Sequence, residues 1–251
     1  MAAARWLIAL VIAAFGMVSY CSNTSDNPIT GEKQRVALSA EEEVALGREL
    51  APQMASQFGG LSASEARVRV QQVGARVVSR SSAANTPYRY AFHLLADRKT
   101  VNAFALPGGQ IFITEALLRM LESEDELAAV LGHEVGHVLA RHSAEHLAKQ
   151  QLTQQLVGAV VVGSGSYETA QLAQIAGSLV NMKHGRDDEL ESDALGLRLL
   201  REAGYDPSAM IRVMQVLEKA SGGSSRPEFA STHPSPANRI ARIREHLESM
   251  K

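Results

Sequence analysis

Two histidines and a glutamate near the middle of the chain have the types and spacing of a metal site. His133, Glu134 and His137 form the pattern His-Glu-x-x-His within the sequence HEVGH. Because four residues make slightly more than one helical turn, both imidazoles project from the same helix face and can share one metal ion. Glu134 then lies beside that metal, where its carboxylate can take a proton from a water molecule. The pattern therefore indicates hydrolytic metal chemistry.

A third protein ligand is expected on another element, because a catalytic zinc ion takes three protein ligands and one water. Glu189 and Asp193 lie four residues apart in a later helical segment and therefore face the same way. Glu189 suits the third ligand, and Asp193 suits an acceptor for the free N–H of a ligand histidine. The alternative for Glu189 is a solvated acidic helix start, which the helix dipole would stabilise. The presence of HEVGH favours the role of Glu189 as a metal ligand over that of a solvated helix start.

The composition is that of an ordinary globular protein of 251 residues. Hydrophobic residues make up 45% and charged residues 21%, which excludes a disordered or fibrous chain. The 25 Lys and Arg residues nearly balance the 27 Asp and Glu residues, which argues against a nucleic-acid-binding protein with a basic stripe. The single cysteine, Cys21, excludes an intrachain disulfide and a thiolate metal cluster. Any metal must be held by histidine and carboxylate side chains.

The N-terminus has the proportions of an export signal. Arg5 precedes an apolar run over residues 6–18, which is too short to span a bilayer comfortably. The sequence Val-Ser-Tyr-Cys that ends at Cys21 resembles a bacterial lipobox, although Tyr20 stands where Gly, Ala or Ser is usual. We predict a signal peptide over residues 1–20 with lipidation of Cys21. An uncleaved anchor and plain secretion are the alternatives, and all three export the rest of the chain.

The remaining sequence predicts a mostly helical domain over residues 39–251, joined to the N-terminus by a polar tether over residues 21–38. Capping-box patterns begin helices at Ser39 and Ser123. Helices are predicted over residues 39–57, 62–79, 123–150, 187–202, 206–220 and 238–250, with a helical hairpin over 156–180. Strands are predicted over residues 88–95, 100–106 and 110–114, and a loop over 221–236.

Several motifs in combination resemble one protein family. They are HEVGH, the pattern Arg-x-x-Glu-x-x-x-Asp from Arg186 to Asp193, Thr-His-Pro around His233 followed by Arg239-Ile240, Asn-Pro-Ile-Thr-Gly at 27–31 and VNAFALPGG at 101–109. The combination resembles the HtpX, BepA and CAAX-prenyl-protease family of zinc metallopeptidases. Its exported bacterial branch, with BepA, LoiP and YcaL and the similar mitochondrial protease Oma, matches best. The resemblance spans about residues 27–245, and Ser192 departs from it, since the family usually has Ala there.

The resemblance implies an α+β, zincin-like fold with a small sheet of three or four strands. It implies that one zinc ion per chain is bound by His133, His137 and Glu189, with Glu134 as the general base. It also implies that a strand beside the cleft binds substrate. That strand contains Asn102, Ala103 and Phe104.

An extended polypeptide could add itself to the edge of that sheet through backbone hydrogen bonds. The segment over residues 109–114 is the alternative border of the cleft. Ordinary core packing is the alternative role of Phe104.

Two further residues have roles that the sequence leaves open. His233 matches a family histidine near the metal. It either stabilises the oxyanion of a tetrahedral intermediate or occupies the fourth zinc position in a latent enzyme; a surface-loop histidine is the remaining alternative. Arg186 either supports the acidic helix beside the metal ligands or binds a substrate carbonyl.

The resemblance implies a zinc metalloendopeptidase that hydrolyses peptide bonds of unfolded or misassembled envelope proteins. We expect it in the bacterial periplasm, held at the outer membrane by a lipid on Cys21. The alternative is a latent zinc-site protein that acts mainly as a periplasmic chaperone or adaptor in outer-membrane protein assembly. A zinc carrier is disfavoured, because storage of zinc has no need of Glu134.

Overall fold

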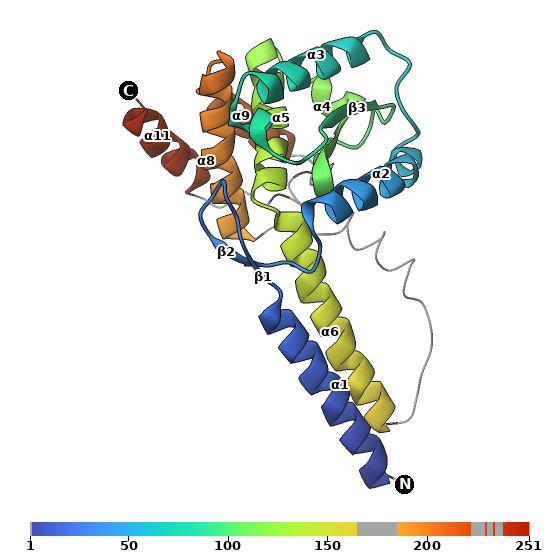
Figure 1. The fold of residues 1–251 in the computed structure, drawn as a ribbon. Coiled ribbons are helices and arrows are strands. Elements are labelled where there is room, and N and C mark those ends of the chain that lie inside the picture. Colours follow the sequence, from blue (N-terminus) through green and yellow to red (C-terminus); the bar gives the residue numbers. More distant parts are fainter. Residues whose placement is uncertain (1, 165–184, 222–228, 230–232, 234–237, 251) are drawn as a thin grey trace.

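The computed structural model describes residues 2–164, 185–221, 229, 233 and 238–250. The α-helices are α1 (Ala2–Ser22), α2 (Ala40–Gln57), α3 (Ala66–Ser79), α4 (Glu115–Leu118), α5 (Glu124–Leu139), α6 (His142–Ser164), α8 (Arg186–Ala203), α9 (Ala209–Ser221) and α11 (Arg239–Ser249). The strands are β1 (Thr24–Asp26), β2 (Lys33–Arg35), β3 (Ala91–Leu95), β4 (Ala103–Leu106) and β5 (Gln110–Thr114), and short 3-10 helices cover Ser82–Asn85 and Pro107–Gly109. Figure 1 shows a rounded body from which α1 and α6 project side by side.

The larger sheet has the strand order β3-β5-β4, so β4 is an edge strand. β3 runs parallel to β5, and β4 runs antiparallel to β5 with Phe104 paired to Phe112. Gly108 and Gly109 in the tight connection between β4 and β5 have φ angles of 74° and 110°, which glycine adopts without strain. The predicted α+β architecture, mostly helical with a small sheet, is confirmed.

α5 carries HEVGH and lies at the centre of the body. Every residue from Glu126 to Leu139 is buried, because α3, α8, α9 and β4 all pack against the helix. Its sequence is accordingly rich in Leu, Ala and Val around the whole circumference, as expected for a helix without a solvent face. The polar residues of HEVGH therefore lie in the protein interior, where they need partners.

The sequence predicts one helix over residues 123–150, whereas the structure has two. α5 ends at Leu139, and α6 begins at His142 after Arg141, whose φ of 57° is left-handed. The guanidinium of Arg141 donates to the buried Glu43 carboxylate at 2.8 and 2.6 Å. Removing either partner would leave a buried charge without compensation. The pair therefore fixes Arg141, and with it the left-handed turn between the two helices.

The segment predicted as a tether instead forms the smaller sheet and packs on the body. β1 and β2 pair antiparallel, and the side chains of Asn27 and Gln34 are buried. Asn27 Nδ2 donates to the carbonyl of Leu139 at 2.8 Å, and Gln34 Nε2 donates to the carbonyl of Ala140. Because the last carbonyls of a helix have no partner within it, this hairpin caps the C-terminus of α5.

α1 covers the predicted signal peptide and reaches one residue past Cys21, which is exposed. Among the described residues, its segment Ala4–Ser22 is long and apolar enough to cross a membrane, with a mean hydropathy of 1.8. A signal sequence can have the same length and hydropathy. The predicted helical hairpin over 156–180 begins within α6, and its part over residues 165–180 lies outside the described residues.

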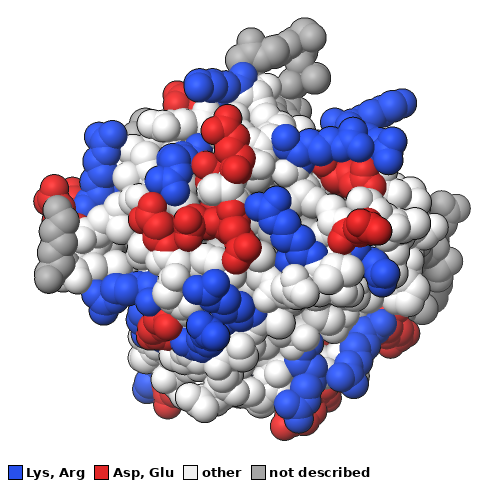
Figure 2. Space-filling view, turned by 90° about the horizontal axis from the view of Figure 1, so that it is seen from above, with Lys and Arg blue, Asp and Glu red and all other residues white. Residues whose placement is uncertain are grey.

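Charged side chains of both signs are interspersed over the face seen in Figure 2. Basic and acidic groups stand next to one another there. Ion pairs between exposed side chains, such as Arg212–Asp206 at 3.2 Å, occur on the described residues. This distribution agrees with the near balance of charges in the sequence.

Replacing Asn27 by Ala should destabilise the protein, because the carbonyl of Leu139 loses its donor and the turn after β1 loses its side-chain acceptor. We expect a loss of about 1–3 kcal/mol in the free energy of unfolding, measured in urea. Glu32→Ala, at an exposed position of the same hairpin, is the control and should change it by less than about 0.5 kcal/mol. Equal stability of the two variants would contradict the capping role.

Candidate active site

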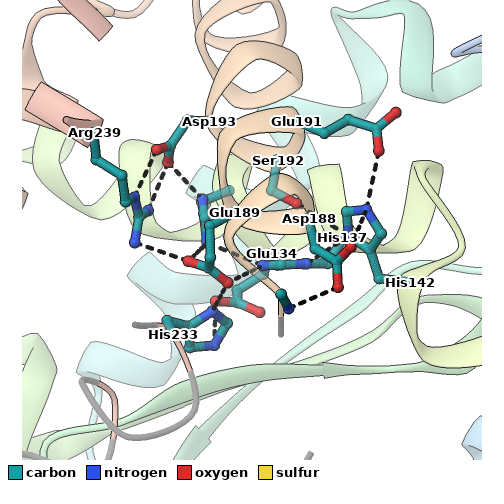
Figure 3. Close-up of polar contacts among 12 residues, drawn as sticks. Glu134, His137, His142, Asp188, Glu189, Glu191, Ser192, Asp193, His233 and Arg239 are labelled. Carbon is teal, nitrogen blue, oxygen red and sulfur yellow. Dashed lines mark hydrogen bonds and ion pairs between the residues drawn. The ribbon is translucent and has the colours of Figure 1, made fainter. Parts of the chain in front are cut away.

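α5 and α8 cross at a short distance because glycines lie at the crossing. A Cβ atom on Gly136 would lie 2.8 Å from the carbonyl oxygen of Ser192, and one on Gly196 would lie 3.2 Å from the backbone nitrogen of His133. The glycine of HEVGH thus permits near contact between the two backbones. The crossing brings the side chains of α8 to the histidines of α5 (Figure 3).

Four side chains from three segments of the chain meet at this crossing. Their ligand atoms all lie within 4.8 Å of one another, and the group consists of His133, His137, Glu189 and His233. His133 Nε2 and His137 Nε2 are 3.1 Å apart, and the Glu189 carboxylate lies 3.5 Å from the first and 3.4 Å from the second. His233 Nδ1 lies 3.0 Å from Glu189 Oε1.

These spacings fit a zinc ion. Histidine and carboxylate atoms bind zinc at about 2.1 Å in tetrahedral sites, so neighbouring ligand atoms lie about 3.4 Å apart. The distances among His133, His137 and Glu189 are close to that value. Two imidazoles and one carboxylate are also a donor set that catalytic zinc sites use. These residues could therefore hold a metal.

Glu134 is a buried carboxylate without compensation from hydrogen bonds. Its side chain is fully buried, and among the described residues neither of its oxygens has a hydrogen-bond partner. Burial raises the pKa of Glu134, although His233 and His133 act in the opposite direction. A buried polar group in this state indicates that another polar group, such as a water molecule, belongs beside it.

Asp193 and Arg239 support His133 on the side away from the other imidazoles. Asp193 Oδ1 lies 3.0 Å from His133 Nδ1, and Arg239 in α11 donates to both Asp193 oxygens at 2.7 Å. Arg239 also contacts Glu189 Oε2 at 2.8 Å and is 1% exposed. Sequence reasoning gave a supporting role to Arg186, but Arg186 is exposed at the first position of α8. Arg239 belongs to the motifs that carry the family resemblance, but sequence reasoning assigned it no role, because it follows a long loop and has no spacing relation to α8.

His137 has a different support, which sequence reasoning also missed. His137 Nδ1 lies 2.8 Å from His142 Nδ1, and His142 Nε2 lies 3.1 Å from Glu191 Oε2 (Figure 3). His142 is buried, whereas the side chain of Glu191 is 26% exposed. His146, one turn further along α6, contacts Asp188 Oδ2 at 2.8 Å.

The electrostatics of the ligands are set by their mutual contacts. Burial opposes a charge on Glu189, but His233, His133 and His137 hold its pKa well below the ordinary value. Burial also opposes a charge on His133, yet its contacts with Asp193 and Glu189 outweigh burial and raise its pKa to about 9. These two carboxylates therefore favour the protonated form of His133.

His233 is buried beside the predicted ligands rather than exposed on a surface loop. Its ring stacks on Phe229 with the ring centroids 4.4 Å apart, and its Nε2 lies 3.7 Å from Glu134 Oε1. The backbone nitrogen of Phe229 donates to the carbonyl of Val101 at 3.0 Å, just before β4. Most of the surrounding residues over 222–237 lie outside the described part of the chain.

The predicted substrate-binding residues lie at the start of the edge strand. Asn102 directly precedes β4, and its backbone exchanges hydrogen bonds with Thr114 at 3.0 and 3.2 Å. Ala103 is buried. Phe104 stacks on Phe112 at 5.0 Å between ring centroids, so its ring belongs to a small apolar cluster under α2.

Comparison with known proteins identifies the family. A model described as Peptidase family M48 matches residues 64–247. The chain belongs to peptidase family M48. The family expected from the sequence motifs is thereby confirmed, and the match includes α5, α8 and all but the last residues of α11, together with the supporting residues on them.

The M48 chain has similar curated relatives in bacteria and in mitochondria. It is 31% identical to the beta-barrel assembly-enhancing protease of Yersinia pestis over 89% of this chain and 48% of that protein. It is 32% identical to the mitochondrial metalloendopeptidase OMA1 of Schizosaccharomyces pombe over 97% of this chain and 72% of that protein. It is 30% identical to the metalloprotease YcaL of Escherichia coli over 66% of this chain and 65% of that protein. The chain spans about half the length of the Yersinia pestis relative.

Metal-free and zinc-loaded protein should respond differently to pH. A histidine whose pKa rises on folding, here from 6.5 to about 9 for His133, stabilises the folded state below pH 6.5, and this contribution disappears as the pH rises through about 9. Zinc takes the place of that proton, so the zinc-loaded protein should not lose this stabilisation as the pH rises. The melting temperatures should diverge from pH 7 to pH 9, and parallel curves would contradict a metal on His133.

Gly136→Ala should open the helix crossing, because the added Cβ meets the backbone of Ser192. We expect the free energy of unfolding to fall by about 1–3 kcal/mol and zinc affinity to fall at least about tenfold. Gly158→Ala on α6 is the matched control, since nothing lies within 4 Å of its Cβ position. Wild-type zinc affinity in Gly136→Ala would contradict the spacing argument.

Proposed function

We propose that this chain is a zinc-dependent metalloendopeptidase. The observation that carries the proposal is the buried Glu134 carboxylate, without a hydrogen-bond partner among the described residues, beside two imidazoles and a carboxylate at the spacing of zinc ligands. A structural metal site would have no use for such a group, whereas a hydrolytic site needs a base next to its water. The M48 match and relatives named as metalloproteases support the same reaction.

In this proposal His133, His137 and Glu189 hold the zinc ion, and Asp193 with Arg239 keeps the imidazole of His133 oriented. Zinc, when bound, polarises a carbonyl group and makes water more acidic. Glu134 accepts the proton of the attacking water and then transfers it to the nitrogen of the leaving amine. Burial raises the pKa of Glu134, which strengthens its carboxylate as the acceptor of the water's proton.

The proposed substrate is a polypeptide in an extended conformation. β4 is an edge strand, and Phe229, on which His233 stacks, bonds to the backbone just before it; an extended chain can pair with such an edge without a strict sequence requirement. We propose that the substrates are unfolded or misassembled envelope proteins, in line with a relative named beta-barrel assembly-enhancing protease. Signal-peptide removal and lipidation of Cys21 would hold the enzyme at the outer membrane from the periplasmic side.

A latent site is the second candidate, and the position of His233 favours it. His233 shares one ligand group with His133, His137 and Glu189, so it could fill the fourth zinc position that water needs. A chain with that contact closed would act mainly as a chaperone or adaptor. His233→Ala would then raise the peptidase activity of the zinc-loaded protein instead of lowering it.

Glu134→Gln should retain zinc and lose peptidase activity. The amide keeps the shape of the side chain but cannot accept the proton, so we expect cleavage of casein to fall by about 100-fold or more. Zinc content measured by atomic absorption should stay at one ion per chain. Addition of a chelator to the wild type is the control and should abolish cleavage.

Wild-type rates in Glu134→Gln would remove Glu134 from the reaction. A zinc-loaded wild type that does not cleave casein would favour the latent state, for which the His233→Ala variant is the next measurement.

A further inference from the structure

We propose that His142 is a positioning residue for the metal ligand His137 and that Glu191 in turn orients His142. The inference rests on the proposed zinc site and assigns the support of its second histidine. A ligand histidine needs an acceptor for its other ring nitrogen, because that contact fixes its tautomer and ring orientation. His133 has the Asp193 carboxylate in this role, at 3.0 Å.

The direction of the hydrogen bonds follows from the geometry. His137 Nε2 faces His133 Nε2 at 3.1 Å, so Nε2 is the nitrogen that points to the metal position. The proton of a neutral His137 must then reside on Nδ1, which lies 2.8 Å from His142 Nδ1. His142 Nδ1 therefore accepts, and its own proton must reside on Nε2. That nitrogen lies 3.1 Å from Glu191 Oε2, which accepts it.

The break between α5 and α6 makes this contact available. In a continuous helix, residues five positions apart lie about 140° apart around the axis and do not face each other. Arg141, with its left-handed φ of 57°, turns the chain so that the ring of His142 faces His137, with centroids 5.0 Å apart. The arginine's bonds to Glu43 hold that turn. The break between the helices thus allows His142, on α6, to contact the metal ligand His137 on α5.

The use of an imidazole in place of a second carboxylate suits the charge of the site. Glu134, Glu189 and Asp193 are already buried there, and Arg239 is the buried cation that contacts two of them. A further buried anion beside His137 would carry a large desolvation cost. His142 is 1% exposed and supplies a neutral acceptor, while the negative charge of Glu191 lies further out at a side chain that is 26% exposed.

The experiment is a zinc-affinity measurement by chelator competition on the full chain in mild detergent. His142→Ala should weaken zinc binding by about 10–100-fold, the usual effect of losing such a partner. His142→Asn should restore most of the affinity, because its amide oxygen can accept from His137 Nδ1–H. His146→Ala is the matched control on the same helix. It removes a contact with Asp188 and should change the affinity by less than about threefold.

A second readout separates positioning from general stability. The visible absorption spectrum of the cobalt-substituted protein reports ligand geometry, and it should change in His142→Ala but not in His146→Ala. If His142→Ala fails to fold, Glu191→Ala decides the matter, with an expected loss of at least threefold in zinc affinity.

Wild-type affinity and an unchanged cobalt spectrum in the folded His142→Ala variant would overturn the positioning role while leaving the zinc site intact. If His142→Ala fails to fold, wild-type affinity in Glu191→Ala would do the same. A wild-type chain that does not bind zinc would overturn the proposed function itself, so the two failures are distinguishable.

Discussion

The close crossing of α5 and α8 is the constraint on which the rest of the site depends. Side chains as short as Asp and Glu reach a neighbouring helix only if the backbones nearly touch, and Gly136 against Ser192 permits that approach. The crossing places a carboxylate beside each of two ring nitrogens of His133, at 3.5 and 3.0 Å. A larger residue in the middle of HEVGH would separate the ligands while leaving both helices intact.

Burial creates the second requirement, which is a balance of charge. Three carboxylates lie in the interior around the ligands, and an isolated buried anion is costly. Arg239 compensates two of them from α11, and the protonated His133 compensates a further part in the absence of metal. A divalent cation would complete the balance, because the same buried carboxylates that are costly beside one another make a bound metal favourable. Glu134 has no hydrogen-bond partner among the described residues, so its carboxylate remains available to accept a proton.

Local patterns predicted much of the fold and part of the site. Capping boxes located the starts of α2 and α5, and β5 has the predicted bounds. The helical spacing of Glu189 and Asp193 gave both of them a place beside the ligand histidines, and in the structure both lie beside His133. The break at Arg141 was not predictable, because nothing in the sequence marks a non-glycine residue as left-handed. Asn27, His142 and Arg239 act through partners that only the tertiary fold brings near, so spacing carried no signal for them.

The position of Arg239 has a consequence for the order in which the buried ligand group assembles. A ribosome releases a polypeptide from its N-terminus, so HEVGH emerges before α11 does. Until α11 docks, Asp193 and Glu189 lack their buried cation, and the ligand group cannot reach its final arrangement. The hairpin of β1 and β2, which caps α5, precedes HEVGH in the chain. A chain built in this way completes its buried ligand group only after α11 has docked, so His133, His137 and Glu189 wait for a helix that is made after all of them.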